Sequence, residues 1–274
     1  MTKATSLTPR VVLGSILFFI ACVVYTPFHA IYMIVAAPCL TLRQRYLAAC
    51  TWNRIIVQLL SFFCGVNYQV QGKENLPTTR AIILAKHQSA WETFAIPVEL
   101  LPNQLCFVFK KELLRIPFFG WAMATMKMIA IDRSKGRDAF TQILEASQDR
   151  MKAGAWMMFF PEGTRVPVGQ KKRYKTGGAR LAIATNTPVV PVALNAGEFW
   201  AKRQFFKKPG TITLRFGPPI SPTGHTAESL TKAVENWIEQ QMADISPQHY
   251  PATNTAAPVQ TCCPHLAAQK SVNS

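Results

Sequence analysis

The chain has 274 residues, enough for one large domain or two small ones. It carries 30 basic and 14 acidic residues, a formal net charge of +16, and its mean hydropathy of +0.10 is high for so charged a chain. A basic and apolar chain favours an anionic membrane leaflet as partner, whereas nucleic acid fits poorly because zinc-finger spacing, an RNA-recognition signature and a basic heptad region are all absent from the sequence.

The first predicted element is an apolar segment from Val11 to Ala37, which has no aspartate, glutamate, lysine or arginine and is interrupted by Pro27 and His29. About 20 apolar residues are enough to cross a bilayer, so one tilted transmembrane helix is possible. A helix broken at Pro27, which enters one leaflet and returns, is also compatible, because positive charge flanks both ends. A cleaved signal peptide fits poorly, since the segment is too long and no clear cleavage site follows. A second apolar segment, Ile55 to Val66, is too short to span, and we expect it to pack on the domain or lie in the interface.

After this N-terminal part, predicted strands alternate with predicted helices. The clearest helix is residues 136–154, whose apolar positions follow helical spacing and which Gly154 can cap. A helix over 89–100 is expected to end at Pro97, and 118–132 is helix-like until it becomes extended near 129–131. The other elements are strands within 68–77, 80–87, 105–113, 155–164, 188–194 and 211–220, and helices over 177–186 and 226–245. This alternation predicts an α/β sheet with helices on its faces.

The C-terminal segment 246–274 is rich in proline, alanine, threonine, glutamine and asparagine, and we expect it to be disordered. It contains Cys262-Cys263-Pro264-His265, which could bind a metal, although a loose tail is the favoured interpretation. The seven cysteines of the chain show no CxxC spacing. This argues against a disulfide framework or a zinc site, and it favours reduced side chains in a domain that faces the cytoplasm.

A histidine, His87, directly follows the apolar run Ile82–Ala85 and Lys86, and Glu92 stands five positions later. The loop after a strand of an α/β sheet faces the crevice where ligands bind, and a histidine there can act as a general base near neutral pH. Residues five apart on one helix point about 140° away from each other. The pair can therefore meet only if His87 lies before the helix and folds back, so that Glu92 fixes the imidazole tautomer.

Two other interpretations of the same stretch stay open. Ser89-Ala90-Trp91-Glu92 matches the capping-box pattern S-x-x-E, which by itself could explain Glu92. Ser89 could also be a nucleophile, but it is not part of a G-x-S-x-G elbow.

Further stretches carry residues that could bind an anionic substrate. The strand 155–160 runs into the turn Pro161–Arg165, where glycine permits close backbone approach and arginine can bind phosphate. Basic residues surround the apolar patch 116–123, and the basic run 170–180 could steer an anionic lipid or an acyl carrier protein. A surface turn, snorkelling side chains and a solvated loop would explain these features equally well. The residues around the patch are Lys110, Lys111, Arg115 and Arg133.

Together and in this order, the stretches resemble the four sequence blocks of the 1-acylglycerol-3-phosphate acyltransferases, the lysophosphatidic acid acyltransferase family of phospholipid synthesis. The resemblance covers residues 65–220. Its blocks are His87–Glu92, Lys110–Gly120 with Ile131–Arg133, Phe160–Arg165, and Val190-Pro191-Val192. Glu92 departs from the pattern, because most members have aspartate there, and this bears on the geometry of the pair and on the acceptor lipid.

The resemblance implies a mixed α/β sheet flanked by helices, with N-terminal membrane-embedded helices over 1–64, a catalytic domain over 65–245 and the tail 246–274. It implies that His87 takes the proton from the sn-2 hydroxyl of 1-acylglycerol-3-phosphate as that hydroxyl attacks an acyl thioester, while Glu92 holds the imidazole. The residues implied to bind the glycerophosphate are Lys110, Arg133, Glu162, Gly163, Thr164 and Arg165.

The same resemblance implies that acyl-CoA or acyl carrier protein is the donor and that the product is phosphatidic acid. It implies no cofactor and no metal, and a catalytic domain on the cytoplasmic side of the inner membrane. Three alternatives remain. The acceptor could be another lyso-lipid, such as lyso-ornithine lipid or a lysophospholipid, or the protein could be a lipid hydrolase that uses Ser89. A non-catalytic membrane scaffold would leave the four blocks unexplained.

Overall fold

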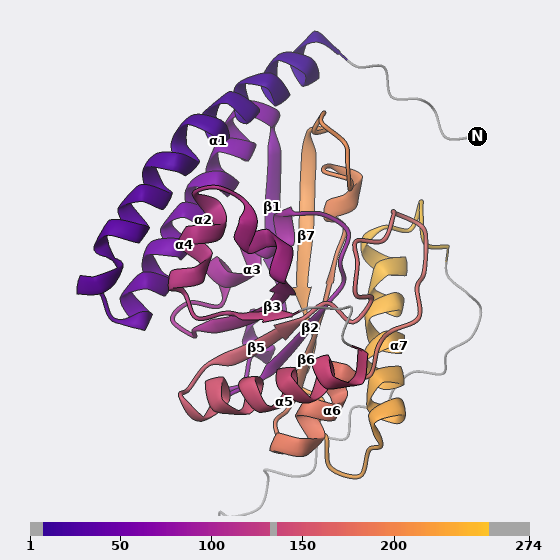
Figure 1. Ribbon diagram of the computed structural model, residues 1–274. Coiled ribbons are helices and arrows are strands. Elements are labelled where there is room, and N and C mark those ends of the chain that lie inside the picture. The colour runs from indigo at the N-terminus through magenta and orange to yellow at the C-terminus, as the bar shows by residue number, and fades with distance from the viewer. Residues whose placement is uncertain (1–7, 132–135, 252–274) are drawn as a thin grey trace, which may run out of the picture.

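The computed structural model describes residues 8–131 and 136–251, and this part of the chain forms one seven-stranded sheet (Figure 1). The strands are β1 (Val66–Gln71), β2 (Ile82–Ala85), β3 (Leu105–Lys110), β4 (Ile129–Ile131), β5 (Trp156–Phe159), β6 (Val189–Leu194) and β7 (Gly210–Phe216). Their order across the sheet is β1-β7-β6-β2-β5-β3-β4. The strands β2 to β6 run parallel, whereas β7 is antiparallel to β6 and parallel to β1. The expectation of a mixed sheet is therefore confirmed.

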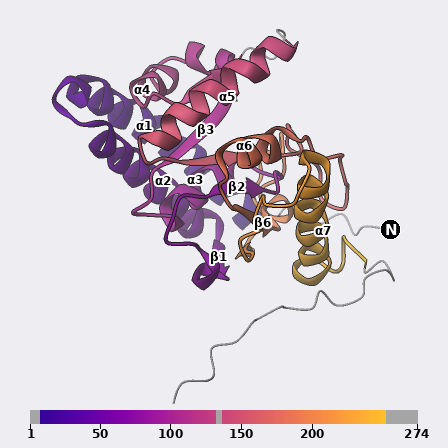
Figure 2. The same ribbon diagram turned by 90° about the horizontal axis from the view of Figure 1, so that it is seen from below.

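Helices cover both faces of this sheet, as Figure 2 shows. They are α1 (Pro9–Ala36), α2 (Leu42–Cys64), α3 (Trp91–Glu99), α4 (Phe119–Thr125), α5 (Gly136–Lys152), α6 (Gly177–Thr185) and α7 (Ala227–Ile245). Successive side chains of a strand point to opposite faces. In β2, Ile83 and Ala85 pack in the apolar cluster shared with α1, α2 and α3, while Ile82 and Leu84 pack in the cluster under α5, α6 and α7. Burial on both faces explains why the central strand reads as an unbroken apolar run.

The two N-terminal helices form a hairpin, since Thr26 of α1 accepts a hydrogen bond from Trp52 of α2 (3.3 Å) and Gly14 lies against the backbone of Phe63. The chain reverses between Ala37 and Thr41, so the prediction of a helix broken at Pro27 is wrong. A proline inside a helix removes one hydrogen bond but need not end it, and α1 continues through this position. The second helix, α2, begins after Thr41, because the Thr41 side chain caps its first turn in a capping box.

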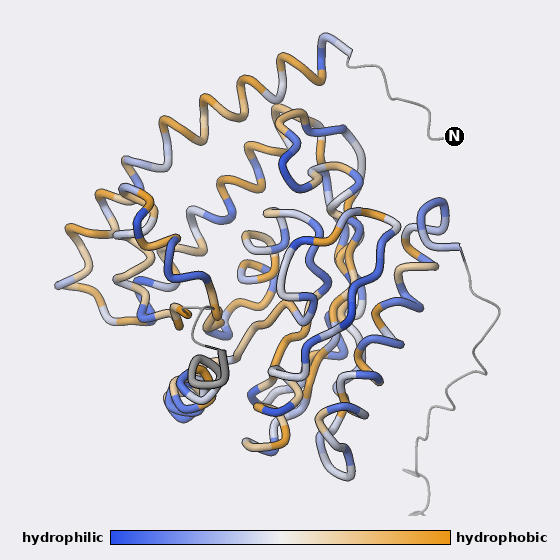
Figure 3. The backbone as a smooth tube through the Cα atoms, turned by 45° about the vertical axis from the view of Figure 1, so that its right-hand side comes forward, coloured by the Kyte–Doolittle hydropathy of each residue, from blue (hydrophilic) through white to orange (hydrophobic). Residues whose placement is uncertain are grey.

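Within the described chain, Pro9–Cys39 and Leu42–Cys64 are each long and apolar enough to cross a membrane. The prediction that the second apolar segment, Ile55–Val66, is too short to cross a membrane is wrong by length, because Arg54 interrupts the apolar run without ending the helix, which begins at Leu42. Figure 3 shows apolar residues along the whole of α1.

Two other boundaries differ from those expected. The helix α3 passes through Pro97 and ends at Glu99. The predicted disordered tail begins too early, because Ser246 and Tyr250 are buried against the domain. Two predictions concern residues outside the described part of the chain, namely those for Arg133 and for the cysteine pair of the tail. The division into an anchor, a catalytic domain and a tail otherwise stays a prediction.

Candidate active site

The candidate site lies where three parallel strands end at the same edge of the sheet. The strand β2 lies between β5 and β6, so the loops that leave their carboxyl ends are neighbours. The first loop carries His87, the second carries Glu162 to Arg165, and the third is the short helix η5 (Ala196–Glu198). Ligands of α/β proteins bind at this edge, because it is here that loops of several strands converge.

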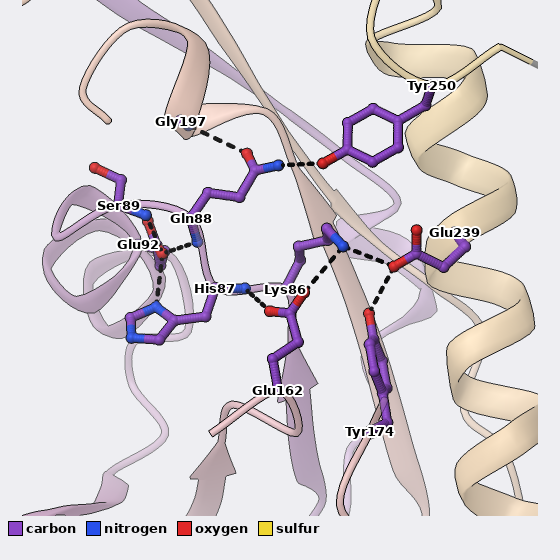
Figure 4. A network of polar contacts seen from close by, with 10 residues as sticks. All are labelled: Lys86, His87, Gln88, Ser89, Glu92, Glu162, Tyr174, Gly197, Glu239 and Tyr250. Atoms are coloured by element: carbon purple, nitrogen blue, oxygen red, sulfur yellow. Dashed lines mark hydrogen bonds and ion pairs between the residues drawn. The ribbon is translucent and has the colours of Figure 1, made fainter. Parts of the chain in front are cut away.

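His87 lies before α3 and folds back onto it. Its Nδ1 is 2.8 Å from Oε1 of Glu92, and the imidazole's other nitrogen points away from the carboxylate (Figure 4). The His87 side chain is 16% exposed and that of Glu92 is fully buried. The carboxylate therefore favours the tautomer with the proton on Nδ1, which leaves Nε2 as the acceptor on the accessible side.

The same carboxylate oxygen also accepts the backbone N–H groups of Gln88 (2.8 Å) and Ser89 (2.7 Å). This is the glutamate half of the predicted capping box, so the structural and the chemical interpretations of Glu92 hold together. The serine half differs, because α3 begins after Ala90 without a side-chain cap, and Ser89 Oγ accepts from Trp91 N at 3.2 Å. Ser89 is buried and does not pair with the imidazole.

An aromatic ring also packs against one face of the His87 imidazole. Phe160, the residue after β5, stacks on His87 with ring centroids 3.8 Å apart and an angle of 15° between the planes. The ring restricts rotation of the imidazole and shields one face of it from water. The sequence contained Phe160 in the third block but did not indicate this contact.

A buried ion cluster lies directly behind the histidine. Nζ of Lys86 is 2.9 Å from Glu162 Oε1 and 2.6 Å from Glu239 Oε1, which also accepts from Tyr174 OH at 3.2 Å. The other oxygen of Glu162 accepts the backbone N–H of His87 at 2.7 Å. The cluster therefore joins β2, the turn after β5 and α7 at the residue that precedes the imidazole (Figure 4).

The cluster has one ammonium group for two carboxylates. Burial lowers the pKa of Lys86, but the charges of Glu162 and Glu239 outweigh burial, so that the pKa lies above its ordinary value. Burial also raises the pKa of the Glu162 carboxyl, and the ammonium of Lys86 offsets this only in part. The excess of negative charge keeps Lys86 protonated.

The turn that follows Glu162 is more open and basic. Gly163 adopts a φ of +70°, which favours glycine. Lys202 Nζ donates to Thr164 Oγ1 (3.2 Å) and to the backbone oxygen of Arg165 (3.3 Å). Val166 N donates to the carbonyl of His87 at 2.7 Å, so this turn is tied to the histidine loop. Thr164, Arg165 and Lys202 are half-buried, and a side chain or ligand can reach them.

The structure brings some of the predicted residues together and separates others. Gly163, Thr164 and Arg165 lie on the turn beside His87, but Glu162 is fully buried with both oxygens occupied. The expected contact between Glu162 and a phosphate does not fit this geometry, because a carboxylate would repel the phosphate and this one has no free surface. Lys110 is exposed at the carboxyl end of β3, on the same sheet edge.

Sequence reasoning missed the residues that support the histidine loop from a distance. Gln88 Nε2 donates to Tyr250 OH (2.9 Å), and Gln88 Oε1 accepts from Gly197 N (3.1 Å). Lys86 and Gln88 flank the histidine in sequence, which was the one available signal. Nothing local pointed to Tyr250, which lies beyond α7 in the segment expected to be disordered.

Comparisons with known proteins indicate the class of protein to which the chain is similar. The family model described as acyltransferase matches residues 67–195, the stretch that holds the histidine loop, the basic turn and β6. The crystal structure of the 1-acyl-sn-glycerophosphate (LPA) acyltransferase PlsC from Thermotoga maritima has the same fold. Its TM-score is 0.71 at 24% identity, with 86% of this chain and 95% of that chain covered. Residues 67–195 thus match the acyltransferase family model, and the chain has the fold of this solved acyltransferase.

Curated relatives narrow the class to a family. The chain is 43% identical over 215 residues to the 1-acyl-sn-glycerol-3-phosphate acyltransferase of Pseudomonas aeruginosa, covering 77% of this chain and 83% of that protein. It is 27% identical to 1-acyl-sn-glycerol-3-phosphate acyltransferase alpha of Mus musculus over 77% of this chain and 75% of that protein. The chain belongs to the 1-acyl-sn-glycerol-3-phosphate acyltransferase family and is an acyltransferase.

Proposed function

We propose that this enzyme transfers an acyl chain from a thioester to the sn-2 hydroxyl of 1-acyl-sn-glycerol-3-phosphate, giving phosphatidic acid, with His87 as general base. Family membership supports the reaction. The observation that supports the base is the hydrogen bond between His87 Nδ1 and the buried Glu92 Oε1 at 2.8 Å. It leaves Nε2 turned away from the carboxylate, as the nitrogen that would take the proton of a substrate hydroxyl (Figure 4).

The proposed step conserves atoms and charge. Nε2 of His87 takes the hydroxyl proton while the hydroxyl oxygen forms a bond to the thioester carbonyl carbon. The carbon–sulfur bond then breaks, and the imidazolium returns the proton to the departing thiolate. Glu92 stabilises the transient positive charge of the ring. An acyl-enzyme intermediate is not required, which suits the buried and engaged position of Ser89.

The acceptor phosphate would bind at the basic turn beside His87. Thr164 offers a hydroxyl group, Gly163 permits close approach of the backbone, and Arg165 can present a planar fork to phosphate oxygens. Lys110 and Arg133 stay further candidates for the phosphate. Glu162 takes a different part in this proposal, because it positions the His87 backbone and does not contact the substrate.

The donor and the location belong to the same proposal. The donor is acyl-CoA or an acyl carrier protein, and both are anionic molecules that a charge of +16 would attract. The helices α1 and α2 anchor the domain at the cytoplasmic face of the inner membrane, where the lysolipid can move sideways from the leaflet into the site. The chemistry as written calls for no metal or organic cofactor.

Acyl transfer in detergent micelles tests the proposal. Wild type, His87→Ala and Ser89→Ala would be given lysophosphatidic acid and an acyl-CoA, while labelled phosphatidic acid and free thiol are followed together. We expect His87→Ala to lose about 10²–10⁴-fold in rate, the usual contribution of a positioned base. Ser89→Ala should keep most of the activity.

Two other outcomes would contradict the proposal in different ways. Thiol release without phosphatidic acid, abolished by Ser89→Ala, would identify a hydrolase. Product formed only from another lyso-lipid would show that the acceptor is wrong, and Glu92 would then be the first residue to exchange for aspartate.

A further inference from the structure

Three large apolar side chains around the start of α4 are exposed. Ile116 is 44% exposed, Phe118 37% and Trp121 52%, and we call these three residues the α4 patch. They follow the short helix η3 (Lys111–Arg115), which itself follows β3. The patch therefore lies one short segment away from Lys110 at the catalytic edge of the sheet.

The backbone of the α4 patch is strained. Phe118 has φ +62° and ψ −63°, and the N–H of Phe119 donates to the carbonyl of Pro117 at 2.7 Å. These values describe a γ-turn of the rare form with positive φ, which is unfavourable for a bulky side chain. Strain of this kind persists where the surrounding structure enforces it, and it is concentrated at functional sites. Here it presents a phenylalanine to the outside.

The patch is attached firmly to the N-terminal hairpin. Arg45 Nη1 of α2 donates to the carbonyl of Thr125 at 3.0 Å, and the rings of Trp52 and Phe119 lie 6.0 Å apart. Figures 1 and 2 show α4 beside α1 and α2. The outward side of α1 is itself apolar, with Phe28 70% exposed and Val35 72% exposed.

The charges next to the patch identify the kind of surface that would cover it. Residues 110–127 contain one acid, Glu112, and four bases, and these five side chains are exposed. Tryptophan accompanied by lysine and arginine is typical of side chains at a membrane–water interface, and each basic residue near an anionic leaflet adds attraction. The four bases are Lys110, Lys111, Arg115 and Lys127.

We propose that the α4 patch is a second membrane-contact surface, which inserts Phe118 and Trp121 at headgroup depth into an anionic leaflet while Lys111 and Arg115 contact lipid phosphates. This rests on the proposed membrane-bound acyl transfer to a lysolipid. A bilayer fits better than a protein partner, because the patch adjoins the exposed apolar side of a helix long enough to cross a membrane. With the patch inserted, Lys110 lies at the level where a lysolipid phosphate would leave the leaflet.

Fluorescence quenching tests the contact directly. The full chain would be reconstituted in vesicles of phosphatidylcholine and phosphatidylglycerol whose acyl chains carry bromine, which quenches nearby tryptophan. We expect the quenched fraction of the emission to fall in Trp121→Phe and to rise slightly in Trp237→Phe, because the second variant removes an emitter that the lipid does not quench. The control Trp237 is half-buried in α7, in the cluster on the opposite face of the sheet. Equal quenching in wild type and both variants would overturn the proposal.

A second experiment separates membrane contact from folding. In Phe118→Gly with Trp121→Ser, the glycine relieves the backbone strain while both apolar side chains are lost. We expect an unchanged or higher melting temperature, with the rate on lysophosphatidic acid in anionic vesicles lowered about tenfold, the effect of about 1.4 kcal/mol. The rate on a short-chain, water-soluble lysophosphatidic acid should not change.

The remaining outcomes are also decisive. Equal loss on soluble and vesicle-bound acceptor would show a structural role and would overturn the proposal. So would a change of the wild-type oligomeric state in the double variant, because the patch would then bind a second copy. If wild type acylates neither acceptor, the proposed function fails, while the quenching experiment still decides whether the patch contacts lipid.

Discussion

Two groups of charged side chains lie at the same sheet edge and differ in what neutralises them. Lys86, Glu162 and Glu239 form a cluster in which each charge meets an opposite one inside the protein. Arg165 lies on the turn after Glu162, and Lys202 donates to this turn from the loop after η5; among the residues that the structure describes, the recorded partners of Lys202 are neutral oxygens. Buried charges that are paired hold the backbone in place, whereas cations without a carboxylate partner are suited to binding an anion from outside.

The largest expected effect is a loss of stability when the buried cluster of Lys86, Glu162 and Glu239 is broken. Lys86→Met would leave two carboxylates without a cation in a buried position, and removing one partner of a buried pair typically costs about 3–5 kcal/mol. Urea unfolding in micelles should show this loss. Lys86→Met combined with Glu162→Gln should be less destabilised than the single variant, since one uncompensated charge is removed. A single variant as stable as wild type would show that the cluster is not compensated as described.

A substitution on the turn after Glu162 should affect substrate binding more than folding. Arg165→Met removes charge-assisted hydrogen bonds to the proposed phosphate, worth about 1.5–3 kcal/mol, and should raise the KM for lysophosphatidic acid about 10–100-fold. The melting temperature and the KM for the thioester should stay near the wild-type values. Arg173→Met, in an exposed position of the basic run, is the matched control. An equal rise in both variants would mean that only the overall charge matters.

Tyr250 tests whether support from a distance matters to chemistry. Tyr250→Phe keeps the ring that lies 5.6 Å from Lys86 Nζ but removes the hydroxyl that Gln88 donates to. A buried donor left without a partner costs about 1–3 kcal/mol. We expect kcat to fall while the KM for lysophosphatidic acid hardly changes, because the variant loosens the histidine loop and leaves the turn intact. A change confined to KM would place Tyr250 in substrate binding.

The smallest expected effect is that of Lys202→Met. Lys202 holds Thr164 and the backbone of Arg165 by two hydrogen bonds to neutral groups, each worth about 0.5–1.5 kcal/mol. The KM for lysophosphatidic acid should therefore rise only a few-fold. Lys208→Met, on the same loop and exposed, should be silent. If the rise also occurs with 1-monoacylglycerol, which lacks the phosphate, Lys202 supports the turn without helping to bind the anion.

Much of the fold could be predicted because its causes are local. Apolar runs of four to six residues became β2, β3 and β6, and the periodic segment 136–154 became α5 with two residues fewer at its end. The predicted helix ends that were wrong depended on packing against parts of the chain that are distant in sequence. Pro27 and Pro97 both stay inside helices, where packing of the apolar faces outweighs the hydrogen bond that proline removes.

The sequence alone determined the order of the four blocks, the position of His87 at the end of a buried strand, and Glu92 as the carboxylate within its reach. These follow from short spacings and from the alternation of strands and helices. Only the tertiary structure decided that Glu162 pairs with Lys86 across 76 residues and that Tyr250 supports Gln88 across 162 residues. A residue type shows that a side chain can be charged, but its partner depends on which strands become neighbours. That order arises from packing the whole chain, and the parallel sheet then brings distant loops to one edge.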